Sequence, residues 1–145
     1  VITALPMMIQ HLDPVYHTKL KMILIDSIQA IVPFQNNHLF HTILNHPSPV
    51  ESSANFLIHG GILGAFNLGF MDFIYKDIGQ QGYEKSMSTF IQTESDSPVL
   101  KKVSNPTIPL PVFPKLGYKW IGSKNNWSYG LASLIFSSIA YDQSL

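Results

Sequence analysis

The chain has 145 residues, and 12% of them are charged, about half of the ~25% usual for soluble domains. Nine lysines balance nine acidic residues, and the sequence contains neither arginine nor cysteine. The lack of cysteine excludes disulfide scaffolds, thiol nucleophiles and cysteine-ligated metals. Few, scattered cations argue against nucleic-acid binding, which needs clustered positive charge. Such a low charge predicts that much of the chain faces lipid or the interior of an assembly.

Two helices are predicted in the first third of the chain. Asp13 and Pro14 suit the cap and first position of an amphipathic helix over 14–32, which Pro33 ends. A shorter helix is predicted over 37–46. The apolar residues of the first helix recur at helical spacing, at Tyr16, Leu20, Ile23, Leu24, Ile28 and Ile31.

A single long helix is predicted over 49–78. The sequence Ser48-Pro49-Val50-Glu51 matches a capping box with proline at the first helical position. No charged residue occurs from Phe56 to Met71. The stretch 56–75 has the ~20 residues that a helix needs to cross a hydrocarbon core. This segment therefore predicts a transmembrane helix.

Small residues are spaced four apart along this predicted helix. Such a strip lets two membrane helices approach closely. An alternative is a buried, glycine-rich segment of a soluble protein, with two strands and a turn at 59–61. The predicted helix-packing residues are Gly60, Gly61, Gly64, Ala65 and Gly69.

Two segments follow with a different character. Residues 82–94 predict a short amphipathic helix, lying at a membrane interface or on the surface of a soluble domain. Residues 95–117 are rich in proline and predict an extended arm that binds a partner; a buried irregular loop is the alternative. The prolines assigned to this arm are Pro106, Pro109, Pro111 and Pro114.

The C-terminal segment, 118–145, predicts an apolar helix over 127–141, with a hairpin as the alternative. The chain as a whole is thus predicted to be mainly α and membrane-associated. Its predicted parts are a helical domain over 1–94, the proline-rich arm over 95–117 and the C-terminal helix or hairpin over 118–145.

Histidines are the candidates for chemistry. His38, His41 and His46 lie close together in the sequence, but they match no metal-binding motif. His59 lies in the predicted membrane span, where it could ligate the metal of a haem or a chlorophyll. No catalytic residue, metal or cofactor is otherwise predicted.

These patterns predict a non-catalytic accessory subunit of a larger membrane complex. Its partners would be other subunits and lipid, and its location an organellar inner or thylakoid membrane, in a mitochondrion or plastid. One alternative is a soluble secreted or virion structural protein with a self-assembling, β-rich fold. The other is a haem- or chlorophyll-binding membrane subunit that uses His59.

Overall fold

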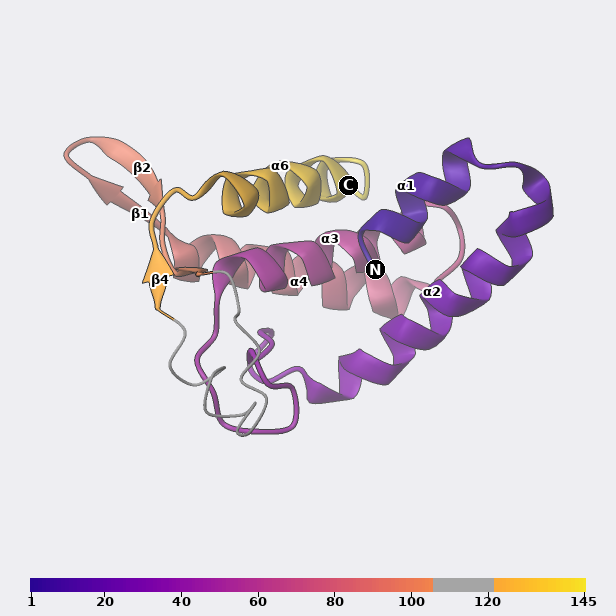
Figure 1. The fold of residues 1–145 in the computed structure, drawn as a ribbon, viewed down its shortest axis with the longest axis horizontal. Coiled ribbons are helices and arrows are strands. Elements are labelled where there is room, and N and C mark those ends of the chain that lie inside the picture. Colours follow the sequence, from indigo (N-terminus) through magenta and orange to yellow (C-terminus); the bar gives the residue numbers. More distant parts are fainter. Residues whose placement is uncertain (106–121) are drawn as a thin grey trace.

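The computed structural model describes residues 1–105 and 122–145, and these are mostly helical (Figure 1). Two short antiparallel ribbons, β1 with β2 and β3 with β4, accompany the helices. Two 3-10 turns, Pro14–Tyr16 and Val32–Phe34, flank the second helix. The helices and strands are α1 (Ala4–His11), α2 (His17–Ile31), α3 (Ser52–Asn67), α4 (Phe73–Phe90), β1 (Ile91–Glu94), β2 (Ser97–Leu100), β3 (Val103–Ser104), β4 (Ser123–Lys124) and α6 (Ser128–Asp142).

The predicted membrane helix over 49–78 is wrong, because the chain turns within it. Helix α3 ends in a Schellman motif: the Gly69 N–H bonds Phe66 O at 2.8 Å, and the Phe70 N–H bonds Ala65 O at 3.0 Å. Gly69 has a φ of +70°, which glycine adopts without the cost that a side chain imposes. A second helix, α4, then begins at Phe73. Over the described residues, no helix combines the length and the apolar character that crossing a membrane requires.

The start of α3 also differs from the predicted capping box. The cap is Glu51, whose carboxylate accepts hydrogen bonds from the N–H groups of Ser53 at 2.8 Å and Ala54 at 2.6 Å. Ser48 instead accepts a bond from the Ile43 N–H at 2.8 Å. A carboxylate here also offsets the positive end of the helix dipole.

The predicted helix over 37–46 is absent. Asn37 and His38 have φ values of 48° and 61°, so the chain makes a tight turn there. Asn36 and Leu39 pair on either side of that turn, and His41 pairs with Val50. Segment 36–51 is therefore a folded-back loop.

The other helix predictions agree better with the structure. The helix expected over 14–32 is present as a 3-10 turn followed by α2. The helix expected over 127–141 is α6. The helix expected over 82–94 forms the second half of α4 up to Phe90, after which β1 begins. The four prolines assigned to the arm lie outside the described residues.

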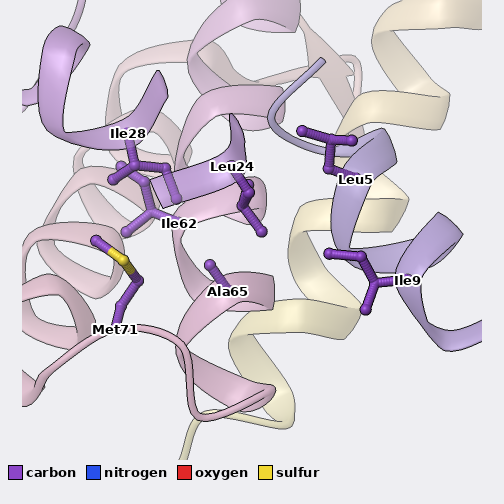
Figure 2. Close-up of a cluster of buried hydrophobic side chains, with 7 residues drawn as sticks. All are labelled: Leu5, Ile9, Leu24, Ile28, Ile62, Ala65 and Met71. Carbon is purple, nitrogen blue, oxygen red and sulfur yellow. The ribbon is translucent and has the colours of Figure 1, made fainter. Parts of the chain in front are cut away.

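Two apolar clusters hold the fold together. The first joins α1, α2 and α3, and Figure 2 shows its side chains converging from these helices. It contains Leu5, Ile9, Leu24, Ile28, Ile62, Ala65 and Met71. The second joins α3 and α4 to the strands, and contains Leu39, Phe56, Leu63, Tyr83, Phe90, Leu100 and Val103.

Candidate functional site

A cavity of about 550 Å³ lies beside the start of α3. Loop 41–51 forms one wall, and residues 102–104 and 122–123 form the other. We call it the α3 pocket. Seven of its ten lining residues have polar side chains, and the lining consists of His41, Thr42, Ser48, Pro49, Val50, Glu51, Lys102, Ser104, Gly122 and Ser123.

Hydrogen bonds fix the two walls relative to each other. Within the loop, the N–H and the hydroxyl of Thr42 both bond Pro49 O, at 3.0 and 2.8 Å. The Ser52 N–H bonds Lys102 O at 3.0 Å, which ties the start of α3 to the opposite wall. Strands β3 and β4 then pair Ser104 with Ser123. The pocket is therefore preformed by the backbone.

The loop wall is also held from inside the protein by Asn55. This buried side chain accepts a bond from the Phe40 N–H at 2.7 Å. Its amide donates to Phe40 O at 3.0 Å and to Glu51 O at 2.8 Å. One side chain thus satisfies both backbone groups of a buried residue that directly precedes His41.

The titratable groups of the α3 pocket differ in how many hydrogen bonds they already make within the protein. Both carboxylate oxygens of Glu51 accept bonds from the first turn of α3, including one from the Ser53 hydroxyl at 2.7 Å. His41 Nδ1 donates to Ser48 O, which leaves Nε2 of the neutral ring as an acceptor. Lys102 is exposed at the edge of the pocket.

His59 does not reach this pocket, since it is fully buried between α3 and α4. Ser86 donates its hydroxyl proton to Gly82 O at 2.7 Å, so it accepts from His59 Nδ1, 3.4 Å away. The Gln35 amide donates to His59 Nε2 at 3.2 Å. Both ring nitrogens are thus engaged, and the ring is neutral. Burial, above all, lowers the pKa of His59 from 6.5 to about 3.

Gly82 is needed for this arrangement, because a Cβ there would overlap the His59 ring. We expect Gly82→Ala to lower the free energy of unfolding by about 1–3 kcal/mol, although alanine favours a helix. Urea unfolding would measure it, with Gln81→Ala, at an exposed position of the same helix, as the control. A Gly82→Ala protein as stable as this control would contradict the expectation.

The glycines predicted to pack a membrane helix make contacts within this chain. A Cβ at Gly60 would lie 2.8 Å from Ser137 Cα of α6, and one at Gly64 would lie 3.2 Å from Pro6 of α1. Gly61 lies under Ile2, where a Cβ would approach the Ile2 backbone to 2.8 Å. Ala65 belongs to the first core cluster, and Gly69 is in the turn after α3.

The sequence pattern did not identify most of the α3 pocket. The sequence places His41 only in a cluster with His38 and His46. Among the described residues, the structure brings together no group of three or more side chains that could hold a metal ion. Lys102 and Asn55 were not singled out. The cue that was available is the run of turn-forming residues 45–49, which predicts a loop before α3.

The comparisons with known proteins identify the fold. No family model and no curated protein match the sequence. A glycoside hydrolase from family 105 of C. acetobutylicum matches 97% of this chain, with a TM-score of 0.87 and 19% identity. A possible family 105 member from Salmonella enterica matches 97% of this chain, with a TM-score of 0.82 and 22% identity. A family 88 glycosyl hydrolase from Bacteroides vulgatus matches 99% of this chain, with a TM-score of 0.79 and 15% identity.

The chain spans less than half of each of these proteins, namely 43%, 37% and 41% of their lengths. At these identities the likeness shows a shared fold. It contradicts the predicted non-catalytic, non-enzymatic subunit of an organellar membrane complex, because the matched proteins are glycoside hydrolases. The β-rich virion alternative and the haem- or chlorophyll-binding alternative find no support either, since the fold is mostly helical and His59 is enclosed.

Proposed function

We propose that this chain forms part of a glycoside hydrolase-like protein, and that its α3 pocket binds a saccharide. The observation that carries the proposal is the likeness of the fold to a family 105 glycoside hydrolase, with a TM-score of 0.87 over 97% of the chain. The position of the pocket comes from the geometry of this chain, not from that likeness.

The chemistry of the α3 pocket suits a sugar. A saccharide presents many hydroxyl groups, each of which donates and accepts hydrogen bonds. The pocket offers the hydroxyls of Ser104 and Ser123, the acceptor Nε2 of His41 and the donor ammonium of Lys102. In small-molecule sites, a few polar groups held in a preformed wall orient the ligand and provide the specificity.

The role proposed for these residues is to bind and orient the sugar. Glycoside hydrolysis generally uses two carboxyl groups that flank the scissile bond. All nine acidic residues of the chain lie within the described residues, and Glu51 is the one that lines the α3 pocket. Its two oxygens are occupied in capping α3. The bond-breaking groups are therefore not assigned to this pocket.

Calorimetric titration with maltose, cellobiose and digalacturonate tests the proposal. We expect at least one of the three to bind, and we expect His41→Ala and Lys102→Met each to weaken binding roughly tenfold, which corresponds to about 1.4 kcal/mol. Lys19→Met, at an exposed position of α2, is the matched control and should leave the affinity unchanged.

Two results would contradict the proposal. One is that none of the three sugars binds the folded protein at millimolar concentration. The other is that Lys102→Met and Lys19→Met have the same effect, which would place binding elsewhere. Circular dichroism should show equal helix content for all variants, because His41 and Lys102 lie outside the helices and Lys102 contributes only its backbone carbonyl to the fold contacts described above.

A further inference from the structure

A second cavity, of about 400 Å³, adjoins the α3 pocket at His41. His41 lines both cavities, so its side chain lies at the boundary between them. The other residues of the second cavity come from two segments, 33–36 and 44–47. We call it the Phe34 pocket. Its volume is within the range of ~300–1,000 Å³ that is usual for small-molecule sites.

Two hydrogen bonds of Gln35 hold Phe34 in place. The backbone N–H of Gln35 closes the 3-10 turn Val32–Phe34 by a bond to Val32 O at 3.0 Å. Its side-chain amide donates to Nε2 of the buried His59 at 3.2 Å. The backbone at Phe34 is therefore ordered before any ligand binds, which lowers the entropic cost of binding.

Phe34 gives its pocket an aromatic surface. The side chain is 41% exposed, although it is large and apolar. The face of an aromatic ring carries partial negative charge. The faces of a sugar ring present C–H groups, and these carry partial positive charge because their carbons are bonded to oxygen. A sugar ring can therefore stack on Phe34 and keep its hydroxyl groups available for hydrogen bonds.

The polar groups of the Phe34 pocket suit an uncharged ligand. His46 Nδ1 donates to Pro47 O at 2.9 Å, which leaves Nε2 of the neutral ring as an acceptor, as in His41. Asn36 and Asn45 also line the pocket, and each amide can both donate and accept. Among the described residues that line it, none is lysine, aspartate or glutamate. A charged group would find no ionic partner here, so the lining favours an uncharged ring.

We infer that the bound saccharide extends past His41, and that Phe34 stacks on a second, uncharged sugar ring. This inference rests on the proposed function, since it takes the first ring to occupy the α3 pocket. His41 lies where the two rings would join, and its Nε2 can accept a hydrogen bond from a hydroxyl of either ring. The ligand is thus at least a disaccharide.

An NMR titration with glucose, cellobiose and maltose tests this inference, because it detects binding at millimolar affinity. We expect cellobiose or maltose to bind about tenfold more tightly than glucose, since the second ring adds contacts. Phe34→Leu keeps an apolar side chain but removes the ring, and should reduce this gain to about threefold and leave glucose binding unchanged. Phe73→Leu, at a phenylalanine that is 75% exposed at the start of α4, is the matched control.

The same titration gives a readout that does not depend on affinity. The ring current of an aromatic side chain shifts protons that lie over its face upfield. The C–H protons of one sugar ring, and not those of the other, should therefore move upfield in the complexes of the wild type and Phe73→Leu. This shift should be absent with Phe34→Leu.

The outcomes separate this inference from the proposed function. If Phe34→Leu and Phe73→Leu bind the disaccharides equally, or if glucose binds as tightly as both disaccharides, the inference is wrong and saccharide binding in the α3 pocket still stands. Binding of digalacturonate without binding of any neutral sugar would also overturn the inference and leave the proposed function intact. If none of these sugars binds, both are rejected.

Discussion

Acid is expected to destabilise this protein through His59, by about 2–3 kcal/mol between pH 6.5 and pH 4.5. The ring is enclosed between α3 and α4, and burial lowers its pKa to about 3. In the unfolded chain the same ring has a pKa near 6.5. Below pH 6.5 the unfolded state therefore binds a proton that the folded state does not, and folding becomes less favourable.

The sign and the window follow from these two pKa values. Above pH 6.5 the ring is neutral in both states, and its titration does not affect stability. From pH 6.5 down to about 3 the free energy of unfolding falls by up to about 1.4 kcal/mol per pH unit. The total of about 5 kcal/mol at the lower end is comparable to the whole stability of many domains.

Urea unfolding at pH 7, 5.5 and 4.5 would measure this effect. Carboxylates also titrate in the acid range, so the comparison needs His59→Gln, which cannot take up a proton there and can still form hydrogen bonds. We expect this variant to be less stable than the wild type at pH 7 and to lose less stability on acidification. Parallel profiles for the two proteins would show that His59 is not the cause.

Helix α3 shows why the sequence favoured a membrane protein. From Phe56 on, apolar residues occur on all sides of it, and such a helix is buried either in lipid or in the middle of a protein. A helix buried in lipid and a helix buried inside a protein can have the same kind of sequence, so only the elements packed around the helix distinguish the two. Here α1, α4 and α6 cover it, and ten of its sixteen residues are buried. Part of the low charge of the chain has the same origin, because this buried helix contains no charged residue.

Local signals predicted the helices where they were strong. Pro14 and Pro33 bracket the second helix, and the apolar run 127–141 predicted α6. Gly69 was assigned to a packing strip, although glycine after an apolar helix is also the usual signal for a C-terminal stop. The turn at Asn37 and His38 was missed because the apolar residues around it happen to have helical spacing.

The α3 pocket was out of reach of sequence reasoning for a physical reason. Its walls come from residues some fifty positions apart, joined by the bond from the Ser52 N–H to Lys102 O. A backbone contact of this kind leaves no pattern of residue types. Asn55 is similar: nothing in its sequence neighbourhood sets it apart, and its importance depends on the position of Phe40, which the chain brings to it from a loop.

Asn55→Ala should therefore be among the most destabilising single substitutions, with an expected loss of about 3 kcal/mol. The change removes three hydrogen bonds, and it leaves the buried N–H and C=O of Phe40 without these partners. A buried polar group left without a partner costs about 1–3 kcal/mol. Asn67→Ala is the matched control, since Asn67 ends the same helix and donates one bond, to Ala140 O at 2.9 Å.

Two measurements separate this role of Asn55 from ordinary packing. Urea unfolding should show Asn55→Ala losing at least twice the stability that Asn67→Ala loses. Hydrogen exchange, measured where both variants remain folded, should show faster exchange of the loop 39–51 amides in Asn55→Ala alone, because Asn55 bonds that loop and Asn67 does not. If the two variants lose equal stability and the loop stays protected, its other hydrogen bonds, such as those of Thr42 to Pro49 O, are sufficient to hold the wall of the α3 pocket.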